Sequence, residues 1–119
     1  MKIQKFEEII AWQKAREFNI LVYKIFSNCK DFSFKNQIER ASVSIMNNIA
    51  EGFERQTNKE FKNFLYISKG SCGEVRSMLS LANDLNYINN NDFDKLYESS
   101  MEISRILSGF IKNLSSSAL

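Results

Sequence analysis

The chain of 119 residues has no histidine, no proline, only four glycines and two cysteines. Without histidine, the Ser–His and Cys–His pairs of nucleophilic enzymes are excluded, and zinc has almost no ligands left. Cys29 and Cys72 lie far apart in the sequence and lack the spacing of a metal site. Acid–base chemistry would fall to carboxylates such as Glu51 and Glu74, which lie among small or polar residues. We therefore expect a non-enzymatic protein with no metal, cofactor or small-molecule substrate.

The chain also lacks an apolar run that approaches the roughly 18 residues of a membrane span. Its first residues, Met1–Glu8, contain no apolar signal core. The length fits a single domain, residues 1–119, and the 44% of apolar residues can supply its core. We expect a cytoplasmic protein with reduced thiols and no contact with membranes.

Net charge is close to zero, at +2, which is too weak to predict nucleic-acid binding by itself. The positive surplus lies in residues 1–30, where six basic side chains stand against three acidic ones. If RNA or DNA binds, the candidate contacts are Lys14, Arg16 and Lys24, because assembly of several copies would repeat their charge. Tyrosines such as Tyr66 could stack on bases, although scattered aromatic residues usually belong to the core and its rim.

Apolar residues recur at helical spacing in four segments, and no segment alternates as a strand does. The expected helices span about residues 6–28, 34–54, 58–87 and 92–114. Ser33 is the expected N-cap of the second helix, and Thr57 with Glu60 forms a capping box for the third. Asn89–Asn91 predicts a turn with left-handed and capping residues, and residues 115–119 are expected to fray. The pattern predicts an all-α fold, an up-down-up-down antiparallel four-helix bundle.

The segment from Gln37 to Arg55 is the most informative part of the chain, because a helical projection divides it into three faces. One apolar face suits a bundle core and consists of Ile38, Ala41, Ile45, Ile49 and Gly52. A second apolar face consists of Val43, Met46, Ala50 and Phe53. A helix in a monomeric bundle needs one apolar face, so the second predicts contact with another copy of the chain. Val43, Met46 and Phe53 are the candidate interface residues.

The next helix also has a second apolar face, which consists of Ile67, Met78, Leu81, Leu85 and Ile88. Four small residues around its centre and in the helix before it, Gly52, Gly70, Ser71 and Gly73, predict close packing of helix backbones. The reason is that a glycine inside a helix costs about 1 kcal/mol relative to alanine, and a close contact would offset this cost. A phosphate-binding loop is the weaker alternative, since no strand precedes the segment and the Gly-Lys-Ser/Thr signature is missing.

The third face of the 37–55 segment is polar and consists of Gln37, Arg40, Ser44, Asn48, Glu51 and Arg55. It is either a solvated face or a contact surface. Its short Ser and Asn side chains favour hydrogen bonds at a contact, whereas solvated faces use long Lys and Glu. We predict that Arg40, Ser44, Glu51 and Glu74 form a largely buried hydrogen-bonded network that fixes helix register and does no chemistry.

The run Asn48-Ile49-Ala50-Glu51-Gly52, followed by Gly70-Ser71 and Glu74, resembles the small bundle proteins encoded within intervening sequences of bacterial 23S rRNA genes. The accessory variability proteins of diversity-generating retroelements are similar relatives. The resemblance implies a four-helix bundle that closes into a homopentameric ring and has no established biochemical role. It marks as signature residues Gln37, Arg40, Ser44, Asn48, Glu51, Gly52, Arg55, Gly70, Ser71 and Glu74. Asn86 replaces the usual glycine before Tyr87 and can still adopt the left-handed conformation.

The preferred interpretation is a non-enzymatic homo-oligomer, expected to be a pentamer, that offers a scaffold or adaptor surface. The alternative is an accessory protein that binds RNA or DNA and acts with a reverse transcriptase, as the retroelement relatives do through a strongly basic surface. The near-neutral charge of this chain departs from that surface. A third interpretation is an enzyme that uses Glu51 or Glu74.

Overall fold

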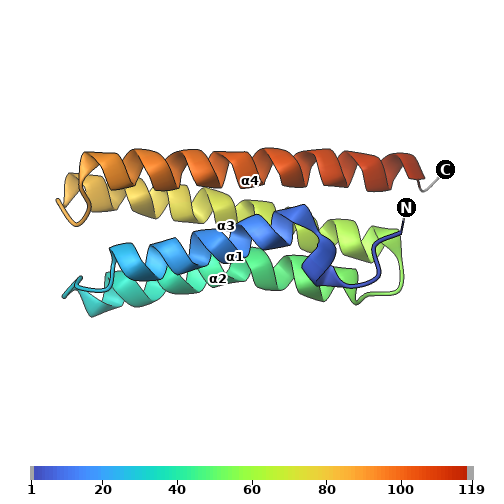
Figure 1. The fold of residues 1–119 in the computed structure, drawn as a ribbon, viewed down its shortest axis with the longest axis horizontal. Helices are drawn as coiled ribbons and strands as arrows, with labels where there is room; N and C mark the ends of the chain where they lie inside the picture. The colour runs from blue at the N-terminus through green and yellow to red at the C-terminus, as the bar shows by residue number, and fades with distance from the viewer. Residues whose placement is uncertain (1, 118–119) are drawn as a thin grey trace.

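Residues 2–117 are described by a computed structural model, in which four α-helices follow one short 3-10 helix. The elements are η1 (Phe6–Glu8), α1 (Ile10–Ile25), α2 (Phe32–Phe53), α3 (Asn58–Asp84) and α4 (Asn90–Ser117). Each helix runs antiparallel to the one before it, and together they form a rod of 48 × 20 × 19 Å (Figure 1). Residues 2–117 contain no strand. The predicted all-α bundle with up-down-up-down order is confirmed.

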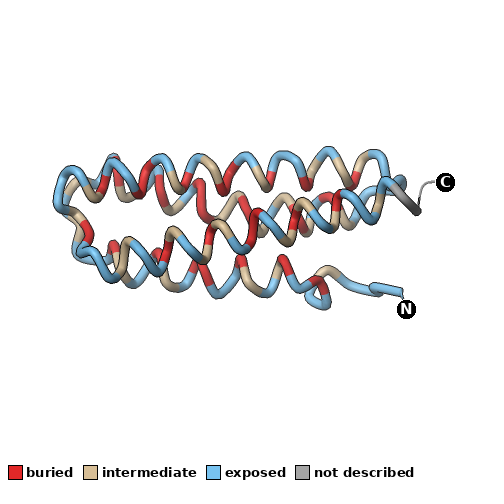
Figure 2. The backbone as a smooth tube through the Cα atoms, turned by 90° about the horizontal axis from the view of Figure 1, so that it is seen from above, coloured by how far each residue is buried: buried red, intermediate tan, exposed pale blue. Residues whose placement is uncertain are grey.

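The core follows one buried face of each helix, visible in Figure 2 as short red segments that recur along the tube. On α2 the predicted core face is confirmed, since Ile38, Ile45 and Ile49 are fully buried. The fully buried side chains of the other helices include Val22 on α1 and Leu65 on α3. α1 contacts α2 and α4 but not α3, so α1 and α3 lie diagonally across the bundle. No helix within residues 2–117 is both long and apolar enough to cross a membrane.

Polar side chains inside the core tie the helices to one another. Ser68 Oγ on α3 donates to the Ile45 carbonyl of α2 over 2.7 Å. Ser42 Oγ on α2 donates to Asn19 Oδ1 on α1, and Asn19 is 6% exposed. Because a buried polar group without a partner is costly, such bonds form only when the helices have the right register.

The helix starts differ from the sequence expectation at two places. The predicted helix 6–28 is divided into η1 and α1, because Ile9 is extended and its side chain enters the core with 3% exposure. The N-cap of α2 is Asp31 rather than Ser33, since Asp31 Oδ1 accepts a bond from the Phe34 amide over 3.1 Å. The predicted cap of α3 is confirmed, because Thr57 Oγ1 accepts from the Glu60 amide over 3.1 Å.

The turn between α3 and α4 is set by Asn86, whose φ is 60°. The Asn86 amide donates to the Asn83 carbonyl, and the Tyr87 amide donates to the Ala82 carbonyl over 2.8 Å. This is a Schellman arrangement, and it ends α3 three residues earlier than predicted. Left-handed geometry thus lies at Asn86 and not within residues 89–91.

α4 begins earlier and ends later than expected. Asn89 Oδ1 accepts from the Asp92 amide over 2.8 Å, which confirms a capping role for this Asn cluster. The helix then continues to Ser117, so the predicted fraying is wrong for residues 115–117. Ser115 Oγ donates to the Ile111 carbonyl and accepts a bond from Lys62, which ties this last turn to α3. The remaining residues of the predicted tail, 118 and 119, lie outside the described part of the chain.

Candidate functional site

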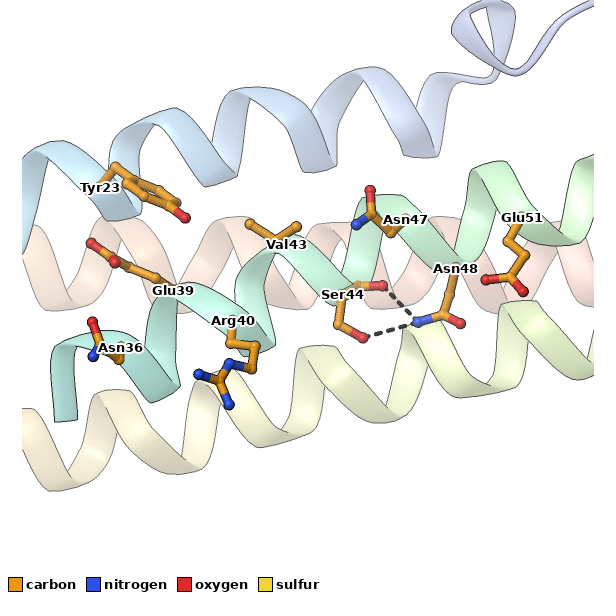
Figure 3. Close-up of a pocket in the computed structure, with 9 residues that line it drawn as sticks. All are labelled: Tyr23, Asn36, Glu39, Arg40, Val43, Ser44, Asn47, Asn48 and Glu51. Carbon is orange, nitrogen blue, oxygen red and sulfur yellow. Dashed lines mark hydrogen bonds between the residues drawn. The ribbon is translucent and has the colours of Figure 1, made fainter. Parts of the chain in front are cut away.

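The polar face of α2 lies along a shallow groove between α2 and α3, which we call the α2–α3 groove. The groove has a volume of about 590 Å³ and is lined by Ser33, Asn36, Gln37, Arg40, Ala41, Ser44 and Glu74. It collects much of the polar signature that the sequence contains, and it is open to solvent. A second hollow of about 460 Å³ continues from it over α2 toward Tyr23 on α1 (Figure 3).

Short side chains form the floor where α2 meets α3. Ser44 Oγ and Ser71 Oγ lie 2.9 Å apart, and Ser71 Oγ also donates to the Ile67 carbonyl. Asn48 Nδ2 donates to the carbonyl and the hydroxyl of Ser44, as the dashed lines of Figure 3 mark. Two residues of the polar signature, Ser44 and Asn48, are therefore joined by hydrogen bonds, together with Ser71 of the predicted close-packing set. Of these bonds, the one between Ser44 and Ser71 joins α2 to α3 and helps to fix their register, whereas the others lie within one helix.

The long charged side chains of the network are not buried, and the prediction is wrong for Arg40, Glu51 and Glu74, which are exposed. Glu51 Oε2 pairs with Arg55 over 3.1 Å, and the Arg55 guanidinium lies 4.7 Å from the centre of the Phe64 ring. Neither Arg40 nor Glu74 has an ion-pair or hydrogen-bond partner within residues 2–117. The reason is the length of the side chains. Ser and Asn side chains end where α2 contacts α3, whereas Arg and Glu side chains extend beyond this contact into solvent.

The glycines behave in two different ways. A Cβ on Gly52 would lie 2.6 Å from Phe64 Cβ and 2.9 Å from Phe61 Cδ1, so α2 and α3 approach closely there. A Cβ on Gly70 would meet nothing within 4 Å, and one on Gly73 would meet only Arg76 at 3.9 Å. Close packing of backbones is therefore wrong for Gly70, which is exposed, and for Gly73, which is half-buried beside Arg76. Ser71 between them is buried against α2.

The candidate interface residues on α2 have less free surface than the projection indicated. Val43 is half-buried, and Met46 and Phe53 are half-buried against the core. The Phe53 ring also contacts the Phe61 ring at 6.0 Å between centroids. Most large exposed apolar side chains lie instead on α1 and α3. They are Ile10, Ile20 and Tyr23 on α1, and Tyr66, Ile67 and Leu81 on α3 with Leu85 at its C-cap, whereas Phe32 is exposed at the start of α2.

The candidate nucleic-acid contacts on α1 are partly occupied by other groups. Lys14 Nζ lies 3.6 Å from Glu102 Oε2 of α4. The Arg16 guanidinium lies 6.0 Å from the centre of the Trp12 ring. Lys24 is exposed. These three cations therefore do not form one free basic surface.

A row of cations that the sequence reasoning missed lies where α3 meets α4. Lys62, Lys69 and Arg76 are seven residues apart, which places them on one face of α3. Arg76 Nη1 donates to Ser100 Oγ on α4 over 3.1 Å. The seven-residue spacing of these cations in the sequence could have revealed the row. The near-neutral net charge of the chain gives no sign of it.

The thiol at this seam is inert. Burial raises the pKa of Cys72 to about 11, against the opposing effect of Arg76 and Lys69. A protonated, fully buried thiol is a poor nucleophile at neutral pH. Within residues 2–117, no three His, Cys, Asp or Glu side chains gather closely enough to hold a metal ion.

Comparison with known proteins places the chain in a family. The model of the 23S rRNA-intervening sequence proteins matches residues 7–109, which include α1, α2, α3 and most of α4. The chain belongs to this family. The resemblance to the 23S rRNA-intervening sequence proteins is therefore confirmed, whereas the relation to the retroelement accessory proteins stays a prediction.

A solved crystal structure has the same fold as this 23S rRNA-intervening sequence protein. It is the 1.70 Å crystal structure of a protein with unknown function from the S23 ribosomal protein family, from Bacteroides thetaiotaomicron. The two chains are 29% identical with a TM-score of 0.81, and the match covers 87% of this chain and 99% of the other. No curated protein matches the chain.

Proposed function

We propose that this chain is a non-enzymatic, cytoplasmic protein that assembles with its own copies into a scaffold. The observation that carries the proposal is a pair of exposed apolar faces on different helices. The α3 face consists of Ile67 and Leu81 with Leu85 at the C-cap, which are 52%, 47% and 45% exposed. The α1 face consists of Ile20 and Tyr23, which are 48% and 47% exposed and lie one turn apart. Exposed apolar side chains that gather on a helix face mark interaction sites on soluble domains.

The two faces point in different directions, because α1 and α3 lie diagonally across the bundle. A contact between the α3 face of one copy and the α1 face of the next leaves a free face at each end. Such a heterologous contact continues from copy to copy until it closes into a ring. The family resemblance supplies the number five, and the geometry supports a head-to-tail contact.

The α2–α3 groove borders the α3 face and adds polar specificity to the contact. Arg40 and Glu74 both line it, and neither has an ion-pair partner within residues 2–117. A neighbouring copy that covers the groove would supply those partners. It would also cover the bare backbone at Gly70, which has nothing within 4 Å of its Cβ position. Support for a role without catalysis comes from the lack of histidine and the solvent-exposed positions of Glu51 and Glu74.

Light scattering at micromolar concentration tests the assembly. The wild-type protein should have a mass about five times 13.8 kDa. Ile67→Glu should give a smaller species with unchanged helix content, because the side chain is 52% exposed and its replacement leaves the core intact. Phe32→Glu is the matched control, since Phe32 is 67% exposed and lies on neither face. A wild-type protein that is monomeric at this concentration would overturn the proposal.

The second candidate is an accessory protein that binds nucleic acid, in the manner of the retroelement relatives that act with a reverse transcriptase. The observation that favours it is the row Lys62, Lys69 and Arg76, which has no carboxylate partner within residues 2–117. Direct binding of RNA or DNA tests this candidate, and it is independent of the assembly.

A further inference from the structure

We propose that the seam between α3 and α4 binds the sugar–phosphate backbone of a nucleic acid through Lys62, Lys69 and Arg76. The inference rests on the second candidate function and not on the assembly. The nucleic-acid contact lies on the side of α3 away from the α2–α3 groove. A neighbouring copy that covers the groove would therefore leave the α3–α4 seam accessible. The seam also replaces the α1 cations as the nucleic-acid contact.

The spacing of the three cations is regular. At the 1.5 Å rise of a helix, a separation of seven residues corresponds to about 10 Å, so the row is about 20 Å long. All three side chains are half-buried, and the charged ends of Lys62 and Arg76 contact α4. Lys69 lies between them on the same face of α3. A straight, even row of charges suits a linear polyanion better than a globular acidic partner.

Hydroxyl groups of α4 form the other side of the seam. Lys62 Nζ donates to Ser115 Oγ over 3.2 Å, and Arg76 Nη1 donates to Ser100 Oγ over 3.1 Å. Ser104 and Ser108 come between these two serines at four-residue spacing from Ser100, on the same side of α4. Lys62 and Arg76 thus have neutral hydrogen-bond partners, so both retain their net charge for a ligand.

The acidic residues of the same stretches are directed elsewhere. Glu60 is held at the start of α3 by Thr57, whose Oγ1 lies 3.1 Å from Glu60 Oε1. Glu74 lines the α2–α3 groove, and Glu102 pairs with Lys14 of α1. Within the described residues, no carboxylate lies within ion-pair distance of Lys62, Lys69 or Arg76. Two more exposed cations, Arg105 and Lys112, lie on the outer surface of α4.

Tyr66 and Gly73 fit the same ligand. Tyr66 is 59% exposed and lies one turn from both Lys62 and Lys69, so its ring is available to stack on an unpaired base. A Cβ on Gly73 would meet only Arg76 at 3.9 Å, so the backbone beside the row is bare. A glycine here costs helix stability, and the close approach of a ligand to the helix backbone would explain it.

Fluorescence anisotropy with a labelled single-stranded RNA of about 20 nucleotides tests the seam at about 50 mM salt and up to about 10 μM protein. The seam variant combines Lys62→Gln, Lys69→Gln and Arg76→Gln. The control variant combines Lys5→Gln, Arg16→Gln and Lys24→Gln, which removes the same charge from the N-terminal region. We expect the seam variant to bind about 10-fold more weakly or worse and the slope of log K against log salt to fall by about 2. The control should change affinity less than about 3-fold.

Two further variants separate binding from folding. Lys69→Gln alone removes no hydrogen bond that the structure contains, and it should reduce the salt slope by about 0.7. The charge-preserving set Lys62→Arg, Lys69→Arg and Arg76→Lys should bind as the wild type does. Light scattering of the seam variant should give the wild-type mass, so that loss of RNA binding is distinguished from loss of assembly.

Four results would overturn the proposal. They are no binding by the wild-type protein, equal losses in the seam and control variants, an unchanged slope in Lys69→Gln, and displacement of the RNA by poly-glutamate at equal charge concentration. The last result would indicate an acidic protein partner instead of a nucleic acid.

Discussion

Tyr87 donates its hydroxyl proton to Asp31 Oδ2 over 2.8 Å, while Asp31 Oδ1 accepts from the Phe34 amide over 3.1 Å. The Asp31 carboxylate thus caps the N-terminus of α2. It also joins the α1–α2 loop to the α3–α4 loop. The Tyr87 ring packs edge-on against Phe34, with 5.3 Å between centroids. This end of the bundle is therefore closed by a polar bond and an aromatic contact that share the same residues.

The Asp31 contacts predict a specific loss of stability in acid. The bond from the Phe34 amide, followed by that from Tyr87, lowers the pKa of Asp31 below its ordinary 3.8. A group whose pKa is lower in the folded state stabilises the fold above its unfolded pKa, and this stabilisation is lost as pH falls toward the folded pKa. Urea unfolding below about pH 4 should therefore depend less steeply on pH in Asp31→Asn than in the wild type. Equal pH dependence in the two proteins would show that Asp31 is not the group responsible.

Gly52 and Gly70 make a matched pair for the packing of α2 on α3. Gly52→Ala should destabilise the protein by about 1–3 kcal/mol, because the new methyl would overlap Phe64 Cβ. Gly70→Ala should stabilise the isolated helix bundle by up to about 1 kcal/mol, since no atom of the described residues lies within 4 Å of its Cβ position. Thermal unfolding measures both. A destabilised Gly70→Ala protein that also has a lower mass would locate Gly70 at a contact between copies.

The left-handed conformation of Asn86 predicts that glycine and alanine substitutions at this position have opposite effects on stability. Its φ of 60° favours glycine, so Asn86→Gly should raise the free energy of unfolding by about 0.5–1 kcal/mol. Asn86→Ala should lower it by a similar amount, because alanine lacks the side-chain polarity that helps asparagine to adopt this conformation. Denaturant titration of the two variants checks the order glycine, asparagine, alanine. Any other order would contradict the Schellman role of this residue.

Substitutions at Met46 and Ile67 distinguish a core position from a position on the assembly face. Met46 is packed against the core, so Met46→Glu should reduce helicity and thermal stability by placing a charge in an apolar environment. Ile67→Glu should preserve circular dichroism and change the mass instead. If Met46→Glu keeps full helicity and dissociates the assembly, the interface lies on the second apolar face of α2, as the helical projection first indicated.

The sequence predicted the helices and the core faces because a single periodicity determines both. Ile38, Ile45 and Ile49 recur with the helical repeat and are fully buried as expected. The helix ends were predicted less accurately, because several neighbouring residues can each serve as the cap. Ser33 and Asp31 are both good caps, and the contact of Asp31 with Tyr87, 56 residues away, is invisible in local sequence.

The surfaces were predicted less well, since a projection shows which residues share a face but not what covers it. Met46 and Phe53 were assigned to a free face, and the core takes up part of their surface. The distinction between Gly52 and Gly70 depends on which neighbour lies opposite each glycine. The Lys62, Lys69 and Arg76 row could have been found from its spacing alone, but its lack of carboxylate partners required the structure.

The most direct test of the scaffold is to mix two variants that each lack one face. Ile67→Glu keeps the α1 face and Ile20→Glu keeps the α3 face, so each protein alone should fail to form the closed ring. If the contact is head-to-tail, an equimolar mixture should form a one-to-one dimer of about twice 13.8 kDa by light scattering, because one intact contact remains. A mixture that stays monomeric, or an Ile20→Glu protein that still assembles as the wild type does, would contradict the pairing of these two faces.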